Sequence, residues 1–247
     1  MFTKPVKTAL LFSALALNGP AAMAGNESQP IPVSVENGTL RWANGEPVYL
    51  FGANYSAPFA YGYRAIARRG IDHKAAIDMD VDHIARLKLD AYRIHVWDKV
   101  ISDKEGNLLD NQYLDLFDYL MMRLQERGIR AIITPIAWWG SGYPEPDPSE
   151  PGFAVGYSKN DMNENPALIA AQQRYLSQFL AHKNRYTGKV IGQDPDIIAF
   201  ELFNEPKHRQ APEKSAAYVE TLITTIRDAG VSKPLFYNIS EQGNQPK

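Results

Sequence analysis

Short apolar segments alternate along this chain with longer segments in which apolar residues recur every three or four positions. The short segments are typical of buried β-strands, and the longer spacing is typical of helices with one buried face. The pattern predicts five strands, at residues 48–54, 91–97, 129–136, 197–203 and 235–239. Because strands and helices alternate, the expected fold class is α/β.

Four helices are expected between and after these strands, at residues 78–87, 110–128, from 165 onward, and 212–229. Asp110 is the expected N-cap of the second helix, and Gly128 is its expected end. Ahead of the first strand, Asn37-Gly38 predicts the tight turn of a small β-hairpin. The hairpin should therefore precede the main domain.

The predicted strands lack a clean alternation of apolar and polar residues, which favours parallel strands covered on both faces. An open doubly wound sheet and a closed eightfold barrel both fit this pattern. No glycine-rich turn follows the first strand, which argues against a dinucleotide site. A (β/α)8 TIM barrel needs eight βα units in about 250 residues. Five strands in 247 residues therefore predict an incomplete barrel, truncated at its C-terminus after about five units.

The first 24 residues have the pattern of a signal peptide. Lys4 and Lys7 precede an apolar stretch at residues 8–17, and Ala22-Met23-Ala24 provides a small-x-small cleavage site. The expected mature chain, residues 25–247, is then secreted or periplasmic and carries no membrane anchor. A buried N-terminal helix is the alternative interpretation of this segment.

Composition excludes several classes of function. The formal net charge is −2, and the lysines and arginines are scattered, so we expect no nucleic-acid partner. The absence of cysteine excludes disulfides, thiolate metal sites and a cysteine nucleophile. No group of histidine and acidic residues has metal-ligand spacing, so no metal or other cofactor is expected. No Gly-x-Ser-x-Gly motif occurs, which argues against an esterase.

The strongest candidate for chemistry follows the apolar segment at residues 197–203, where the chain continues as Asn204-Glu205-Pro206. Proline cannot continue the ladder of a central strand, so Asn204 and Glu205 should lie at the edge of the sheet. A carboxyl group at the end of a buried strand is in a setting that can keep it protonated, as a general acid requires. A helix-capping or salt-bridging glutamate is the alternative.

A long connection, at residues 138–164, leaves the third predicted strand at the same edge. Loops longer than about 15 residues in compact domains are often functional. Trp138 and Trp139, at its base, offer aromatic faces that can stack on sugar rings. The alternative is that one of the two packs beneath the loop.

Several segments together resemble the retaining glycoside hydrolases of clan A, most closely the family-five cellulases and endo-β-mannanases. The most specific segment is Asp194 to Pro206, which contains Asn204-Glu205-Pro206 and resembles the region of the fourth barrel strand. Weaker likenesses lie at residues 36–55, 92–95, 186–188 and 240–243. Residues 25–247 would accordingly form a partial glycoside hydrolase catalytic domain.

The resemblance implies roles for individual residues. Glu205 would be the general acid and base, Asn204 would bind the 2-hydroxyl of the sugar at the cleavage point, and Arg93 would steady the nucleophile. In the family the nucleophile is a glutamate after the seventh strand. We expect none in this chain, because Glu241 stands at the end of the fifth.

Further substrate contacts are expected from residues at the ends of the strands and in the loop, namely Tyr55, His95, Trp138, Trp139 and Glu241. For His95, a satisfied core residue is the alternative. Glu201, four residues before Glu205, is expected to be buried and neutralised by Arg93, His95 or another interior group, because an unpaired buried carboxylate is costly.

The resulting hypothesis is an exported retaining glycoside hydrolase that acts on a β-1,4-linked polysaccharide, either mannan or glucan. Two alternatives stay open. The chain can be a truncated, non-catalytic fragment that at most binds carbohydrate, or an exo-acting clan A β-glycosidase.

Overall fold

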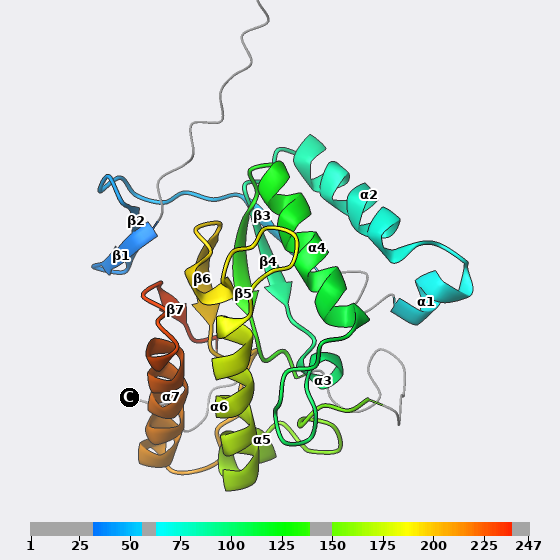
Figure 1. Ribbon diagram of the computed structural model, residues 1–247. Coiled ribbons are helices and arrows are strands. Elements are labelled where there is room, and N and C mark those ends of the chain that lie inside the picture. The colour runs from blue at the N-terminus through cyan, green and yellow to red at the C-terminus, as the bar shows by residue number, and fades with distance from the viewer. Residues whose placement is uncertain (1–31, 56–62, 139–149, 239–247) are drawn as a thin grey trace, which may run out of the picture.

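The computed structural model of the protein describes residues 32–55, 63–138 and 150–238 (Figure 1). The predicted signal peptide, Trp139 and Glu241 lie outside the described residues. Within the described ranges, no helix is long and apolar enough to cross a membrane.

The described residues contain a five-stranded parallel sheet and a separate two-stranded hairpin. The strands of the sheet are β3 (Gly52–Tyr55), β4 (Ala91–His95), β5 (Arg130–Thr134), β6 (Ile197–Glu201) and β7 (Leu235–Phe236). They cross the sheet in chain order, each parallel to its neighbour. A doubly wound sheet reverses its order at a switch point, whereas a βα barrel adds its strands consecutively. The observed order therefore favours the barrel.

Helices cover the strands on their outer side (Figure 1). They are α1 (Tyr63–Arg68), α2 (His73–Arg86), α3 (Asp98–Ile101), α4 (Gln112–Glu126), α5 (Asp161–Glu164), α6 (Pro166–Ala181) and α7 (Pro212–Asp228), with a 3₁₀ turn, η1, at Ile191–Gln193. α2 packs against α4, and α6 packs against both α5 and α7. The four long helices correspond to the four predicted ones, whereas the short helices α1, α3 and α5 were not predicted.

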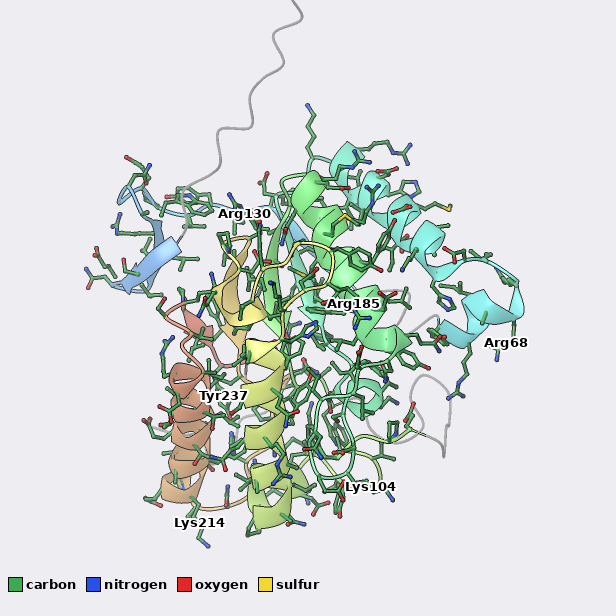
Figure 2. The ribbon with its side chains drawn as sticks, in the orientation of Figure 1. Arg68, Lys104, Arg130, Arg185, Lys214 and Tyr237 are labelled. Atoms are coloured by element: carbon green, nitrogen blue, oxygen red, sulfur yellow. The ribbon has the colours of Figure 1, made fainter. Side chains whose placement is uncertain are left out.

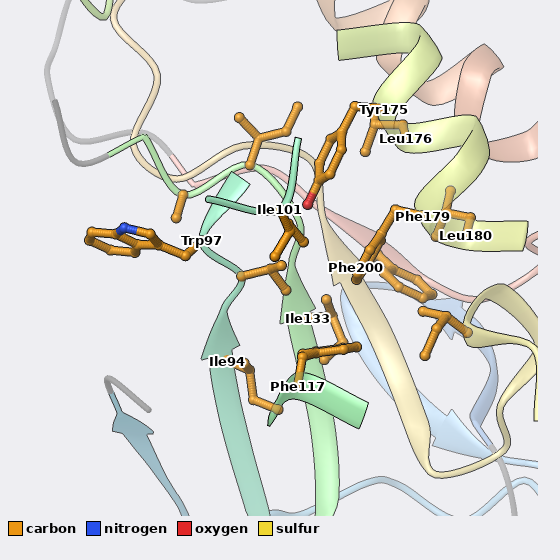
Figure 3. Packing of buried hydrophobic residues seen from close by; sticks show 14 of the residues in the cluster. Ile94, Trp97, Ile101, Phe117, Ile133, Tyr175, Leu176, Phe179, Leu180 and Phe200 are labelled. Atoms are coloured by element: carbon orange, nitrogen blue, oxygen red, sulfur yellow. The ribbon is translucent and has the colours of Figure 1, made fainter. Parts of the chain in front are cut away.

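The core lies between the strands and these helices. Phe200 and Ile133, on β6 and β5, are fully buried and face the aromatic residues of the helix layer (Figure 3). The ring centroids of Phe117 and Phe179 are 5.4 Å apart, so α4 and α6 meet through an aromatic contact. Every residue of β6 is buried. Burial on both faces explains why the strands are apolar without alternation.

The hairpin forms as predicted, from β1 (Pro32–Glu36) and β2 (Thr39–Trp42). Asn37 and Gly38 have φ angles of 49° and 75°, as a tight two-residue hairpin turn requires. The prediction of a strand at residues 48–54 was wrong in its first half. The Val48 amide donates to the Leu40 carbonyl of β2 (2.8 Å), so this segment extends the hairpin and joins the parallel sheet only at Gly52.

Two helix starts also differ from the prediction, and in both cases a cap explains the difference. The side chain of Asn111, and not that of Asp110, accepts from the amides of Tyr113 and Leu114 at the start of α4. Helix α2 begins at His73 because Asp72 accepts from the amide of Ala75 (2.9 Å). The first turn of α2, residues 73–76, contains no large apolar residue, so the apolar spacing placed the start of the helix too late.

The strands point their carboxyl ends to one edge of the sheet. Arg130, labelled in Figure 2, marks the opposite edge, where β5 begins, and Tyr237 follows the carboxyl end of β7. β5 and β6 end two residues earlier than predicted, at Thr134 and Glu201. The residues that follow them form the rim on which the candidate site is built.

Candidate functional site

One guanidinium group joins several strand ends at this edge. Arg93, on β4, donates through Nη1 to Oδ1 of Asn54 on β3 (2.9 Å) and through Nε to Oε2 of Glu201 on β6 (3.1 Å). Its Nη2 also donates to Glu201, and it reaches Oδ1 of Asn204 at 3.3 Å. Arg93 thus holds β3 and β6 in fixed positions relative to β4.

Glu201 is the buried carboxylate that forms an ion pair with Arg93. Its side chain is only 4% exposed, and Oε2 also accepts from the hydroxyl of Thr134 at the end of β5. A buried carboxylate persists when it is paired and hydrogen-bonded. The prediction that Glu201 is buried and neutralised by Arg93, His95 or another interior group is therefore confirmed, with Arg93 as the partner. Thr134 is a further partner that the sequence did not indicate.

Both the oxygen and the nitrogen of the Asn204 side-chain amide are hydrogen-bonded. Oδ1 accepts from Arg93, and Nδ2 donates to the carbonyl of Ala137 (3.2 Å). Its backbone amide donates to the carbonyl of Ile136 (3.0 Å). The side chain is buried, so these contacts set its orientation before any ligand binds.

Glu205 follows Asn204 directly and differs from expectation. The sequence predicted a buried setting at the end of a core strand, but Glu205 is exposed. The strand ends at Glu201, and the chain then turns so that Glu205 has a φ angle of 50°. That conformation is uncommon for a residue other than glycine, and such backbone conformations cluster at functional sites. The turn presents the carboxyl group to solvent at the rim.

Trp138 lies at the neighbouring rim, four residues after β5 ends at Thr134. It is partly buried against the core and has a φ angle of 35°. Nζ of Lys159, from the returning part of the long connection, lies 5.5 Å from the centroid of its ring. One aromatic side chain of the predicted pair is therefore at the site.

His95 is buried at the end of β4, two residues after Arg93. Burial lowers the pKa of its imidazole from the ordinary 6.5 to about 4, and the charges of Arg93 and Lys159 add to this effect. His95 is therefore neutral near neutral pH. A neutral imidazole can donate and accept hydrogen bonds without adding charge to the site.

Asp98 belongs to the site and was missed from the sequence. It is buried at the start of α3, three residues after the end of β4. Oδ1 accepts from the amides of Ala137 (3.0 Å) and Trp138 (3.2 Å). Burial raises the pKa of its carboxyl group from 3.8 to about 6, against the lowering effect of these two amides. An acidic residue just after an apolar strand was the only signal that the sequence offered.

The structure brings together Arg93, His95, Trp138, Asn204 and Glu205 at one edge of the sheet. Tyr55 ends β3 at the same edge, but its side chain lies outside the described part of the structure. The predictions for Trp139 and Glu241 also lie outside it. Over the described ranges, no three histidine or acidic side chains are grouped so that they could hold a metal ion.

Comparison with known proteins identifies the family of this chain. A model of the cellulase family, glycosyl hydrolase family 5, matches residues 43–241. Mannan endo-1,4-β-mannosidase 2 from Oryza sativa subsp. japonica is 27% identical over 126 residues, which cover 46% of this chain and 28% of that relative.

Solved structures show the same fold. The endo-1,4-β-mannanase from Rhizomucor miehei matches with a TM-score of 0.61 and 17% identity, over 83% of this chain and 59% of that one. A family 5 mannosidase from Rhizomucor miehei matches with a TM-score of 0.62 and 18% identity, over 89% and 58%. An exo-β-1,4-mannosidase from an Opitutaceae bacterium matches with a TM-score of 0.61 and 18% identity, over 83% and 34%.

The chain therefore spans less than two thirds of the length of each of these relatives. The likeness in fold confirms the predicted α/β barrel class, of which the described residues contain five consecutive strands.

Removing Arg93 should leave Glu201 as an uncompensated buried charge. We expect Arg93→Met to lower the free energy of unfolding by about 3–5 kcal/mol. The double variant Arg93→Met/Glu201→Gln should be more stable than Arg93→Met, because it no longer contains the unpaired buried carboxylate of Glu201. Urea unfolding gives the free energy of unfolding of the wild type, the single variant and the double variant.

The matched control is Arg127→Met, which breaks the exposed pair of Arg127 with Asp82. We expect this change to cost less than about 1 kcal/mol. A double variant no more stable than Arg93→Met would contradict the role given to Glu201.

Asp98 should give the stability a measurable pH dependence. The unfolded group ionises near pH 3.8, whereas the folded group keeps its proton until about pH 6. In this window the folded state binds more protons, so the contribution of Asp98 to the free energy of unfolding falls as the pH rises from about 4 to about 6.

The amide side chain introduced by Asp98→Asn does not titrate in this pH range. The stability of this variant relative to the wild type should therefore increase between pH 4 and pH 6 and stay level above pH 7, as measured by urea unfolding at each pH. His95 has the opposite pH dependence, but it is present in both proteins and cancels in the difference. A difference that does not change with pH would show that Asp98 does not titrate in this range.

Proposed function

The chain belongs to glycosyl hydrolase family 5, the cellulase family, and from this premise we propose that it hydrolyses β-1,4-linked mannan with Glu205 as the general acid and base. The placement of Asn204 and Glu205 on the rim beside Arg93 is the observation that carries the proposal. Mannan is preferred over glucan because the relatives named above are mannanases and mannosidases.

The proposed chemistry begins with proton transfer from the Glu205 carboxyl group to the glycosidic oxygen as the bond to the anomeric carbon breaks. The Glu205 carboxylate later takes a proton from the water that completes hydrolysis. Glu205 projects from the rim into solvent, where a polymer can reach it.

A retaining mechanism also needs a second carboxyl group about 5–5.5 Å from the first. Glu201 is held by Arg93 and Thr134, so we assign it to positioning Arg93 and not to covalent attack. As the family resemblance implies, we propose that the nucleophile is a glutamate that follows another strand of the complete barrel. We assign that role to no residue of the described part of the chain.

Neighbouring side chains fit the recognition of one sugar ring. We propose that the Trp138 ring stacks on the apolar face of a pyranose, as aromatic side chains do with such faces. Asn204, already oriented by Arg93 and Ala137, then contacts the 2-hydroxyl. His95, neutral because of its lowered pKa, provides a further polar contact.

Exo-action on mannan is a second candidate, because an exo-β-1,4-mannosidase is among the structures of similar fold. Product analysis separates the two modes. Endo-action releases oligosaccharides of several lengths from the start of the reaction, whereas exo-action releases one short product.

Glu205→Gln tests the proposed role directly. We expect it to lower kcat on mannan by about 10²–10⁴-fold, the usual contribution of a general acid, and to leave the affinity for mannohexaose within about threefold. Initial rates and isothermal titration calorimetry provide the two values, with cellulose and aryl glycosides measured alongside.

Glu213→Gln is the matched control, because Glu213 is an exposed glutamate on α7. It should leave both values unchanged. Near-normal turnover of Glu205→Gln on all three substrate types would exclude the acid/base role. A wild-type chain that binds mannohexaose without cleaving mannan would instead support the carbohydrate-binding alternative.

We also propose that the chain is exported, as the sequence of residues 1–24 indicates. A polymeric substrate cannot enter a cell, so a mannan-degrading enzyme must meet it outside the cytoplasm. Expression in a bacterial host should give a processed product beginning at Gly25 in the periplasm or medium, identified by mass spectrometry. An unprocessed chain that retains Met1 in the cytosolic fraction would overturn this proposal.

A further inference from the structure

The rim segment after β5, here called the β5 lip, consists of residues 136–138 and lies between the ends of β4 and β6. The last regular bond between β4 and the β5 strand runs from the amide of Val96 to the carbonyl of Thr134 (2.9 Å). Beyond it the chain after β4 turns into α3 and no longer follows β5. The lip therefore needs another partner on this side.

The side chain of Asp98 is that partner. Its Oδ1 accepts from the two successive amides of the lip, those of Ala137 (3.0 Å) and Trp138 (3.2 Å). On the other side, Asn204 binds the carbonyls of Ile136 and Ala137. Two amides and two carbonyls of a three-residue segment are thus held from opposite sides by two residues.

Asp98 does not touch the space where a sugar would bind. It is 1% exposed, and the two hydrogen bonds of its Oδ1 go to backbone amides of the lip. Its effect on the site must therefore act through the lip. Trp138 has a φ angle of 35°, a conformation that a bulky residue keeps only where its surroundings fix it. The bond from the Trp138 amide to Asp98 is one such constraint.

We propose that Asp98 is a positioning residue for the sugar site. It holds the β5 lip so that the ring of Trp138 and the amide of Asn204 are both oriented for the same pyranose before substrate arrives. The proposal rests on the function proposed above, because it takes this rim to be the place where the sugar binds. Its contribution is preorganisation, which raises affinity by removing the cost of ordering the site on binding.

Asp98→Ala removes the acceptor, whereas Asp98→Asn keeps an oxygen that can accept from the same two amides. We expect Asp98→Ala to weaken the binding of mannohexaose by about tenfold or more, and Asp98→Asn to stay within about threefold of the wild type, as preorganised contacts imply. Asp98→Ser, with a shorter acceptor, should fall between them, and it replaces Asp98→Ala if that variant does not fold.

Asp194→Ala is the matched control for the loss of a buried carboxylate. Asp194 is also fully buried, but it accepts from the amide of Asp196 (3.0 Å) and from Gln125 (2.6 Å) ahead of β6, at the opposite edge of the sheet. It should lower the melting temperature as Asp98→Ala does but leave the affinity for mannohexaose within about threefold. An equal loss of affinity in both variants would reduce Asp98 to a general stabiliser and overturn the proposal.

A second measurement does not depend on sugar. Proteins labelled with 5-fluorotryptophan give one fluorine resonance for each tryptophan, and Trp138→Phe identifies that of Trp138. Asp98→Ala should shift or broaden this resonance, whereas Asp194→Ala and Asp98→Asn should leave it in place. An unmoved resonance in Asp98→Ala overturns the role of Asp98, whatever the affinity.

The two measurements separate this inference from the proposed function. If the wild-type chain does not bind mannohexaose, the proposed substrate fails, and the fluorine resonance alone decides whether Asp98 positions Trp138. If the wild type binds and Asp98→Ala binds equally well, the proposed function stands and the positioning role is wrong.

Discussion

A single buried ion pair determines how the carboxyl edge of this sheet is arranged. Glu201 lies at the end of β6 with almost no access to water, and its buried charge requires a partner. Arg93 supplies it from β4 and uses its remaining donors on β3 and on Asn204. Because a guanidinium is planar and its donors are fixed in direction, these contacts restrict how the strand ends can be arranged.

The rim residues derive their positions from this arrangement. Asn204 is oriented by Arg93 on one side and by the β5 lip on the other, and the lip is held in turn by Asp98. Glu205 and Trp138 follow these anchored positions, and each has a left-handed backbone conformation that directs its side chain at the edge of the barrel. The proposed catalytic and stacking residues thus project from backbone that is fixed by buried contacts.

Much of the fold could be predicted because local patterns and tertiary structure agree. The buried strands are short and apolar, and the pairing of Arg93 with Glu201 follows from the cost of a buried charge. The failures came where a tertiary contact decided the outcome. Val48 pairs with the hairpin instead of the sheet, Asn111 replaces Asp110 as a cap, and Glu205 turns outward. Asp98 was missed because its partners are backbone amides. Every residue except proline has such an amide, so the residue types near Asp98 gave no indication of the contact.

The separation of the two charges along the chain has a consequence for synthesis on the ribosome. The strands join the sheet in the order in which they are made, so each new βα unit can dock on an edge that already exists. Arg93 and Glu201, however, are 108 residues apart. Four helices, α3 to α6, lie between them in the chain, so the rim can become ordered only after the nascent chain has passed β6.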